Sequence, residues 1–476
     1  MTARRPAQVS GAAPASGAAR YAGRTVLVAG AGVSGVPVAE ALLAAGADVT
    51  VTDRQDSDAL AGLAAAGAHV LIGVEDPPAG TTDVVTSPGW RPDHPLLVSA
   101  HRAGLEVYSE PELAWRMRGP GSAPWLAVTG TNGKTTTVTM LASMLRAAGH
   151  RTAAVGNIGT PLLTAALDDS YDVLAVELSS FQLHWSSTLA PQVGVVLNLA
   201  DDHLDWHGGF AQYGAAKTAV WRGNSVAVGN ADDDRVTALL SGGGAPRTAA
   251  FTLGIPQPGE LGVVEDLLVD RTFGPGGPAN ATELATVADV RPLGPHNVAN
   301  ALAAAALARA YGIEADAVRA GLRAYTPEPH RNARVAEVGG VTYVNDSKAT
   351  NPHAALASLR SYERVVWVAG GLFKGVDVDD LVRTVADRLA GVVLLGAERA
   401  RVAEALARHA PDVPVTDVAA TDDGAMVQVV DAAARLARPG DVVLLAPAAA
   451  SMDMFRGYGH RGDAFAAAVR DRAERT

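Results

Sequence analysis

The chain has 476 residues, a net charge of -11 and no cysteine. At roughly 150 residues per domain, this length predicts about three domains. The acidic charge argues against a nucleic acid or an anionic membrane surface held by bulk electrostatic attraction. Without cysteine there are no disulfides, thiolate metal sites or cysteine nucleophiles, so His, Asp, Glu and Lys must carry any chemistry.

The first residues and the apolar runs bear on location. Residues 1–22 are rich in small side chains and lack the apolar core of a signal peptide, so we interpret them as a flexible arm. Apolar runs such as 298–308 are interrupted by polar residues well before the roughly 20 residues that a membrane helix needs. We expect a cytoplasmic, monomeric protein without membrane spans.

The first predicted domain, residues 23–119, begins with an apolar strand, a helix and a second strand ending at Asp53. Between the first strand and the helix stand Gly30, Gly32 and Gly35, which let a helix N-terminus approach a pyrophosphate. This pattern favours a nucleotide site. A glycine turn needed only for packing is one alternative, and an NAD oxidoreductase is another, although no hydride-transfer site follows.

The second predicted domain, residues 120–329, opens with a strand that leads into GTNGKTT, Gly130 to Thr136, and then a helix. In such a loop, backbone amides surround phosphate oxygens, Lys134 lies near the terminal phosphates, and the Thr135 hydroxyl stands where Mg²⁺ binds. Val128 stands where the usual phosphate loop has its first glycine. The context still predicts ATP binding, and a second nucleotide loop would be surplus in an NAD enzyme.

Ionisable side chains follow the next predicted strands. Glu177 ends a strand, where a second carboxylate ligand for the nucleotide Mg²⁺ belongs. His203 and Lys217 lie in the charged segment 198–217. Taken alone, a strand-end glutamate is more often simply exposed, a histidine structural and a lysine solvated.

The third predicted domain, residues 330–476, again alternates strands with helix-like runs such as 378–390. The fold class is therefore expected to be α/β in three domains: an N-terminal Rossmann-like domain, a central P-loop ATPase-like domain and a C-terminal Rossmann-like domain. Segments 118–124 and 326–332 are the predicted hinges of a domain closure that would exclude water from the reaction.

Four strings occur in order in the predicted central domain: GTNGKTT at 130–136, VELSSFQL at 176–183, NLADDHLDWHG at 198–208 with AAK at 215–217, and GPHNVANALAA at 294–304. Together they resemble the central ATP domain of the Mur ligases and of folylpolyglutamate synthetase. The resemblance extends over essentially the whole chain. It implies ATP and two Mg²⁺ ions as cofactors.

The resemblance implies metal-binding roles for four side chains. Thr135 and Glu177 would hold the first Mg²⁺. Lys217 matches a lysine that reacts with CO₂, and its carbamate would help to hold the second Mg²⁺ near His203, because the reaction turns an ammonium into an oxygen anion.

Nucleotide contacts also follow from the resemblance. Asn297 and Asn300 match asparagines that contact adenine; the alternative is that they are helix caps, and Asn297 could do both. Arg331, in PHR, matches an arginine that reaches the γ-phosphate, and Asp346, in DSKATN, matches a ribose contact. The implied nucleotide-binding set is Gly130, Thr131, Asn132, Gly133, Lys134, Thr135, Thr136, Asn297, Asn300, Arg331 and Asp346.

Three further strings, SPG at 87–89, GGLFKG at 370–375 and the segment 447–465, resemble the D-glutamate-adding branch of the family. The implied substrates are UDP-N-acetylmuramoyl-L-alanine and D-glutamate, in peptidoglycan precursor synthesis. Tyr458 stands where the branch commonly has phenylalanine, so the role of its hydroxyl is open. The implied substrate contacts are Val33, Ser34, Asp53, Arg54, Ser87, Gly89, Asn157, Thr350, Lys374, Ser451 and Tyr458.

The resemblance also implies the order of the chemistry. The γ-phosphoryl group of ATP would pass to the substrate carboxylate, and the amine of D-glutamate would attack the acyl phosphate. The implied catalytic residues are Lys134, His203, Lys217, Arg331 and Lys348. Sister ligases share the ATP machinery, but the chain reads ATNP where the diaminopimelate-adding branch has DNPR, which favours D-glutamate. A nucleotide-binding module, which needs no third-domain lysines, is the remaining alternative.

Overall fold

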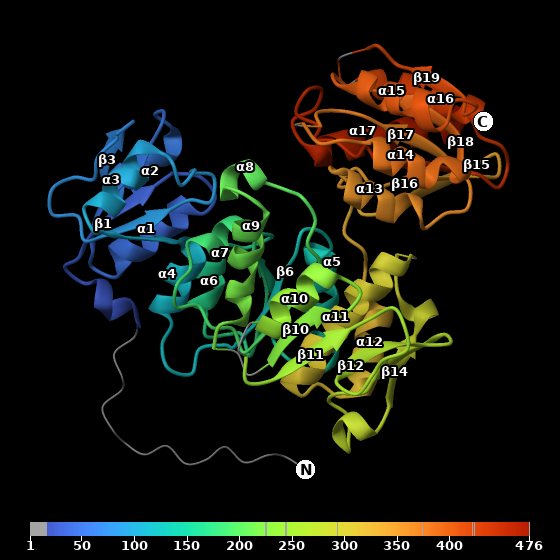
Figure 1. Cartoon of the computed structure of the whole chain (residues 1–476). Coiled ribbons are helices and arrows are strands. Elements are labelled where there is room, and N and C mark those ends of the chain that lie inside the picture. The colour runs from blue at the N-terminus through green and yellow to red at the C-terminus, as the bar shows by residue number, and fades with distance from the viewer. Residues whose placement is uncertain are drawn as a thin grey trace. The chain divides into compact units, whose positions relative to one another are not determined.

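Short apolar strands alternate with helices along the whole chain, and they form three separate sheets (Figure 1). The computed structural model describes residues 17–223, 226–242, 245–292, 294–373, 375–420, 422 and 424–475. Contacts divide the chain into two compact units. The first contains the residues up to 264, with 269–284 and 302–321; the second contains 265–268, 285–301 and the remainder from 322. The predicted α/β class is confirmed.

The first sheet is parallel and has the strand order β3-β2-β1-β4-β5. Its strands are β1 (Thr25–Ala29), β2 (Asp48–Asp53), β3 (His69–Ile72), β4 (Asp83–Thr86) and β5 (Glu106–Ser109). The accompanying helices are η1 (Gly17–Tyr21), α1 (Gly35–Ala44), α2 (Asp58–Ala65), α3 (Pro95–Arg102) and α4 (Glu110–Met117). Strands β2 and β3 lie on one side of β1, and strands β4 and β5 lie on the other side. Sheets of this kind bind ligands beyond the carboxyl ends of their strands at such a change of side, here between β1 and β4.

Helices cover both faces of this sheet. Val26 and Val28 of β1 belong to the cluster that includes α1, whereas Leu27 belongs to a second cluster that includes α3. Successive side chains of a strand point to opposite faces, so a strand that is apolar at every position is buried on both sides. Tyr21 of η1 is also buried, so the packed part of the chain begins before the predicted boundary at residue 23; residues 1–16 lie outside the described residues.

The second sheet has the strand order β14-β13-β12-β11-β10-β9-β6-β8-β7. Its strands are β6 (Trp125–Thr129), β7 (Ala154–Gly156), β8 (Leu174–Glu177), β9 (Val193–Val196), β10 (Val226–Asn230), β11 (Thr248–Phe251), β12 (Glu260–Val264), β13 (Leu267–Asp270) and β14 (Thr282–Thr286). The strands from β7 to β12 pair in parallel. The carboxyl ends of β6 and β8 therefore meet at one edge, where the phosphate loop begins.

Helices and short turns surround this sheet. They are α5 (Lys134–Ala147), α6 (Leu162–Ala166), α7 (Ser180–His184), α8 (Leu204–His207), α9 (Phe210–Lys217), η2 (Thr218–Trp221), α10 (Asp234–Gly242), η3 (Gly277–Ala279), η4 (Val287–Asp289), α11 (Pro295–Tyr311) and α12 (Ala315–Ala324). The apolar run 298–308 lies in α11, and every residue from Ala301 to Ala308 is buried. A helix that is apolar on all sides is expected in a core rather than at a surface.

The third sheet, in the second unit, has the order β15-β16-β20-β17-β18-β19, and only β15 with β16 is antiparallel among the pairings described. Its elements are β15 (Ala333–Val338), β16 (Val341–Asn345), α13 (Pro352–Leu359), β17 (Val365–Ala369), α14 (Asp379–Val385), η5 (Ala386–Arg388), β18 (Leu389–Leu394), α15 (Arg399–His409), β19 (Val415–Asp417), α16 (Ala425–Leu436), β20 (Val442–Leu445) and α17 (Tyr458–Arg475). The predicted helix 378–390 was too long: α14 ends at Val385, and Leu389 already begins β18, because the buried run that follows belongs to the sheet.

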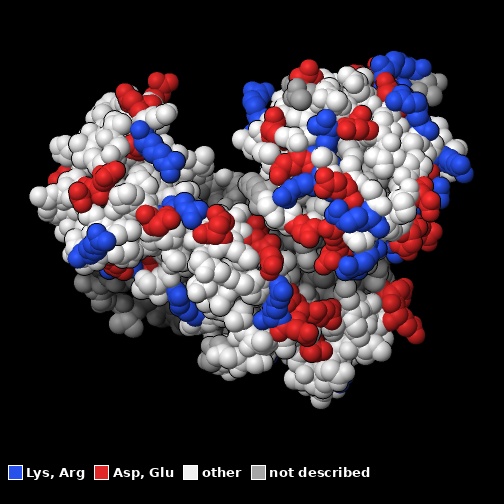
Figure 2. Space-filling model, turned by 45° about the horizontal axis from the view of Figure 1, so that its top comes forward, with Lys and Arg blue, Asp and Glu red and all other residues white. Residues whose placement is uncertain are grey.

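Two further properties concern the surface. Among the described helices, none is both long enough and apolar enough to cross a membrane. Figure 2 shows acidic and basic side chains interspersed on the viewed face instead of collected into one large basic patch.

Candidate functional site

The phosphate loop connects β6 to α5. Its backbone conformation favours glycine over other residues at two positions. Gly130 has a φ of 154°, and a Cβ there would lie 2.9 Å from the Cβ of Leu197. Gly133 adopts the left-handed conformation directly before α5. Val128 still belongs to buried strand β6, so the turn starts at Gly130 and needs no glycine at that earlier position.

Hydrogen bonds with side chains hold the backbone of the loop in place. The Lys134 ammonium donates to the carbonyl oxygens of Gly130 and Thr131 at 2.9 and 2.8 Å. Asn198 accepts from the Asn132 amide at 2.9 Å and donates to the Asn132 carbonyl at 3.0 Å. Asn198 was not among the predicted residues, although it is the first letter of the NLADDHLDWHG string. The loop is therefore shaped before any phosphate reaches it.

Oxygen atoms suited to a hard cation lie at the carboxyl ends of β6 and β8. The Thr135 hydroxyl donates to Oε2 of Glu177 at 2.7 Å, and the Asn157 amide donates to Oε1 at 3.0 Å. Glu177 is buried. Hydroxyl and carboxylate oxygens are ligands that Mg²⁺ accepts, so the predicted pair of Thr135 and Glu177 fits this ion. Among the residues that the structure describes, no group of three or more His, Asp or Glu side chains forms a ready metal cluster.

Lys217 ends α9 in a buried position, 2% exposed, and donates to the carbonyl of Gly130 at 2.9 Å. Its ammonium lies 4.6 Å from the centre of the Tyr213 ring. Burial, and then the charge of Lys134, lower the pKa of Lys217 well below its usual value. A neutral amine is the form that reacts with CO₂, so the surroundings of Lys217 suit carbamate formation.

His203 and His207 of the same string have different environments. His203 is half-exposed, has a φ of 53°, and places Nε2 3.4 Å from Oδ1 of Asp202. His207 is buried, its Nε2 lies 3.0 Å from the Ser180 hydroxyl, and burial lowers its pKa to about 4. His207 is thus a structural histidine, while a metal-binding role for His203 stays a prediction.

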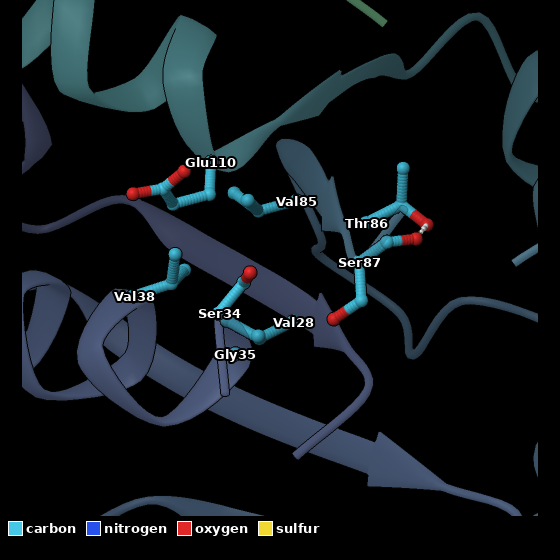
Figure 3. A pocket seen from close by; sticks show the side chains of 8 residues that line it. All are labelled: Val28, Ser34, Gly35, Val38, Val85, Thr86, Ser87 and Glu110. Atoms are coloured by element: carbon cyan, nitrogen blue, oxygen red, sulfur yellow. Dashed lines mark hydrogen bonds between the residues drawn. The ribbon is translucent and has the colours of Figure 1, made fainter. Parts of the chain in front are cut away.

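A pocket in the first sheet lies where the strand order reverses. It is lined by Val28, Ser34, Gly35, Val38, Val85, Thr86, Ser87 and Glu110 (Figure 3). A Cβ at Gly35 would lie 1.8 Å from the Gly30 carbonyl, so glycine is required for the tight turn. Asp53 accepts backbone amides from Ala31 at 2.8 Å and Arg54 at 2.7 Å, so it shapes the glycine loop.

The predicted substrate contacts around this pocket differ in exposure. Ser34 and Ser87 line the pocket, whereas Val33, the residue before Ser34, is 83% exposed and is not among the lining residues. Gly89 and Arg54 are exposed. A direct substrate contact by Asp53 stays a prediction, since both of its oxygens already accept backbone amides.

In the second unit, Asn297 and Asn300 are buried one turn apart on α11. The Asn300 amide lies 3.3 Å from Oδ1 of Asn297. Within the described residues, Nδ2 of Asn297 is buried without an acceptor. Asn297 is the third residue of α11 and not its cap, so the capping alternative is wrong for it. An unpaired buried amide fits a ligand acceptor such as a purine nitrogen.

Residues 330–348 and the start of α17 form a second cluster in this unit. His330 and Asn332 have φ values of 62° and 54°. The Lys348 ammonium lies 4.0 Å from the centre of the Tyr458 ring. Asp346 accepts the Asn332 amide at 3.1 Å, and burial raises its pKa to about 6. The structure thus brings the predicted Lys348 and Tyr458 together.

Arg461 joins this cluster and was missed by the sequence reasoning. It is buried and donates to the hydroxyl and carbonyl of Ser347 at 3.0 and 2.9 Å and to the Ala449 carbonyl at 3.1 Å. The Ser347 hydroxyl in turn donates to the Tyr458 carbonyl at 2.8 Å. Arg461 therefore fixes the segment beside Lys348. Arg461 lies within the segment 447–465, but arginines are rarely fully buried, so the sequence alone does not predict its structural role.

Comparisons with known proteins agree with this geometry. Residues 128–308 match the model of the Mur ligase middle domain, and residues 330–449 match the Mur ligase, glutamate ligase domain. The UDP-N-acetylmuramoylalanine--D-glutamate ligase of Thermobifida fusca is 60% identical over 458 residues, which cover 94% of this chain and 98% of that protein. The chain belongs to the Mur ligase family.

Other Mur ligases extend the comparison. The proteins of the same name from Streptomyces avermitilis and Mycolicibacterium smegmatis are 58% and 49% identical, each over 94% of this chain. The solved structure of UDP-N-acetylmuramate-alanine ligase from Thermotoga maritima has a TM-score of 0.57 and 18% identity over 94% of this chain and 99% of that chain. At that identity the structural likeness supports the Mur ligase fold alone.

The structure of this Mur ligase groups its predicted residues into three sets. Lys134, Thr135, Asn157, Glu177 and Lys217 lie around the phosphate loop, with Thr131 held by the Tyr213 hydroxyl at 2.8 Å and Thr136 in the first turn of α5. Ser34, Ser87 and Asp53 lie at the first-sheet pocket. Arg331, Asp346, Lys348, Thr350, Ser451 and Tyr458 belong to the second unit. The predicted Lys374 lies outside the described residues.

Proposed function

We propose that this Mur ligase joins D-glutamate to UDP-N-acetylmuramoyl-L-alanine at the expense of ATP, in cytoplasmic peptidoglycan precursor synthesis. The observation that carries the proposal is the linked set around the phosphate loop, in which Lys134, Thr135, Glu177 and Asn157 converge on one sheet edge. The relatives that share this chain over nearly its full length are named for the same two substrates. The working form is proposed to be a monomer.

In the first half-reaction, the substrate carboxylate attacks the γ-phosphorus of ATP, the bond from that phosphorus to the bridging oxygen breaks, and an acyl phosphate and ADP form. Lys134 and the loop amides offset the negative charge that gathers when two anions approach. Thr135 and Glu177 would hold one Mg²⁺, and carbamylated Lys217 with His203 would hold a second. These ions would supply charge neutralisation and alignment of the phosphate oxygens. Asn157, fixed against Glu177, would orient the carboxylate.

In the second half-reaction, the amine of D-glutamate attacks the acyl phosphate, the amide forms, and phosphate leaves. Arg331 and Lys348 would stabilise the charge of the transferred group. The face of Tyr458 holds the Lys348 ammonium, which would fix its direction. The D-glutamate carboxylates would be held by Thr350, Lys374, Ser451 and Tyr458.

The first experiment measures phosphate release and amide formation with ATP, Mg²⁺ and UDP-N-acetylmuramoyl-L-alanine. D-glutamate is compared with L-glutamate, L-alanine, diaminopimelate and D-alanyl-D-alanine. We expect the amide only with D-glutamate. Activity with another amino acid would move the proposal to a sister ligase, and ATP binding without any amide would favour a nucleotide-binding module.

Variants test the assignment of sites. Asn297→Ala is expected to weaken ADP binding about tenfold, because it removes a buried hydrogen-bond donor that we propose to bind the base. Ser451→Ala is expected to raise KM for D-glutamate while leaving ADP affinity unchanged. If either variant weakened the binding of ADP and of D-glutamate equally, the separation of the two sites would be contradicted.

A further inference from the structure

Glu110 is a buried acid that the proposed mechanism does not use. It is the first residue of α4, it is 2% exposed, and it lines the first-sheet pocket. Figure 3 shows it across the pocket from Ser34 and Val38, with Val85 beside it. Charged side chains are almost never fully buried unless a partner holds them. The partner of Glu110 therefore indicates what the residue does.

The partner is the first turn of α6, in the part of the chain that follows the phosphate loop. The Leu163 amide donates to Oε1 of Glu110 at 2.6 Å, and the Leu162 amide donates to the same carboxylate. The residue before α6 is Pro161, whose side chain cannot cap a helix. Glu110 thus supplies, from 53 residues away, the acceptor that α6 lacks locally.

The segment that Glu110 holds also carries Asn157. Only the residues from 158 to 161 separate Asn157 from α6. At its other end this loop is fixed to the predicted metal ligand: the Asn157 amide nitrogen of the backbone donates to the Glu177 carbonyl at 2.9 Å, and its side chain donates to the Glu177 carboxylate at 3.0 Å. A Cβ at Gly156 would lie 2.3 Å from that Glu177 carbonyl, so the approach is close. The loop is pinned between Glu110 and Glu177.

We propose that Glu110 is a positioning residue, which holds the Asn157 loop so that the substrate carboxylate is presented to the γ-phosphate. This inference rests on the proposed function, because it assumes that the sugar nucleotide occupies the first-sheet pocket. Glu110 is well placed for the role, since its backbone lies at the pocket and its carboxylate lies on α6. The pocket is lined by Val28, Val38 and Val85 together with the polar Ser34, Thr86 and Ser87, but the hydrogen bonds described for the Glu110 carboxylate come from the two backbone amides of α6, which therefore orient it.

A double-mutant cycle tests the proposal. The variants are Glu110→Gln, Asn157→Ala and the two combined, assayed well below the unfolding temperature of each. Glu110→Gln keeps one acceptor oxygen and loses the second, so we expect kcat to fall about tenfold, with ADP affinity within twofold of the wild type. If Glu110 acts through Asn157, the double variant retains the kcat of Asn157→Ala alone.

Glu112→Gln is the matched control, because Glu112 is also a buried acid of α4 but contacts residues 187–189 instead of the Asn157 loop. Its effect on kcat is expected to multiply with that of Asn157→Ala. Multiplicative effects of Glu110→Gln and Asn157→Ala, or an unchanged kcat in Glu110→Gln, would overturn the positioning role. A wild type that forms no amide with D-glutamate would instead overturn the proposed function, so the two failures are distinguishable.

Discussion

Two lysine side chains share one backbone carbonyl in the phosphate loop. Lys134 and Lys217 both donate to the oxygen of Gly130 at 2.9 Å. Two ammonium groups this close repel each other, and the more buried one is deprotonated more easily. Burial, together with this repulsion, lowers the pKa of Lys217 and so suits its amine to react with CO₂.

Lys217→Arg is expected to lower kcat about 100-fold, because a guanidinium stays charged and forms no carbamate. ADP binding should remain. Thr218→Ala, which changes the adjacent residue with an exposed hydroxyl, serves as the control. The measurement is kcat for both variants, together with a ¹³C signal of the carbamate in wild-type protein supplied with labelled bicarbonate. Full activity of Lys217→Arg would contradict the carbamate.

Glu110 also makes stability depend on pH. Burial raises the pKa of Glu110 from 4.5 to about 7. Because the pKa of Glu110 is higher in the folded than in the unfolded protein, the proton on Glu110 stabilises the fold. This contribution to the free energy of unfolding, about 3 kcal/mol, is fully present below pH 4.5 and is lost as the pH rises through about 7. Relative to Glu110→Gln, which cannot titrate, the wild type should lose thermal stability between pH 4.5 and 8. Unfolding temperatures of both proteins across this range check it, and parallel curves would contradict it.

At the scale of elements, Glu112 connects the first turn of α4 to the segment after α7. Its carboxylate accepts the amides of Ser187, Thr188 and Leu189 at 3.0, 3.0 and 3.1 Å, and Nε of Arg116 at 2.8 Å. Three consecutive amides around one buried carboxylate make a nest that substitutes for water. The predicted hinge at 118–124 lies directly beside this nest, so we expect no closure there.

Glu112→Ala should lower the free energy of unfolding by about 3–5 kcal/mol, because it leaves Arg116 and the three amides without their buried partner. Glu106→Ala removes the other, half-exposed acid that contacts Arg116 and should cost at most about 1 kcal/mol. Urea unfolding of both variants provides the comparison. Equal losses would show that burial of Glu112 is irrelevant.

The contrast between predicted and missed residues follows from distance along the chain. Lys134 and Thr135 lie within one contiguous string, and the spacing of its residues predicts a phosphate loop. Glu177 ends a strand that the apolar pattern predicts. Asn198 and Glu110 act on residues 66 and 53 positions away. A glutamate that opens a helix is also typical of a solvated surface, so nothing in the local sequence distinguishes Glu110 from such a residue. Long-range partners of this kind require the fold.

At the scale of the whole molecule, the remaining predicted hinge is 326–332. His330 and Asn332 adopt left-handed backbone conformations there, with φ values of 62° and 54°. Residues other than glycine hold such conformations at some cost in energy, and they concentrate at switch and ligand-clamping segments. The last boundary between the two units defined by contacts lies at residues 321 and 322, just before this segment, which itself belongs to the second unit.

We therefore expect small-angle scattering profiles to differ between the free protein and the protein with a non-hydrolysable ATP analogue, Mg²⁺, sugar nucleotide and D-glutamate together. His330→Gly and Asn332→Gly, which relieve the left-handed strain, should alter the free profile more than the liganded one. Superimposable profiles for the free and fully liganded wild type would contradict closure.

The nest around Glu112 also has a consequence for recombination between related genes. Glu112, in the helix that follows the first sheet, accepts hydrogen bonds from the amides of residues 187–189, so a crossover placed between residues 112 and 187 would separate the acid from these donors. A crossover near residue 326 would divide the chain where no such shared buried acid is described. Chimaeras joined near residue 326 should therefore fold more often than chimaeras joined between residues 112 and 187.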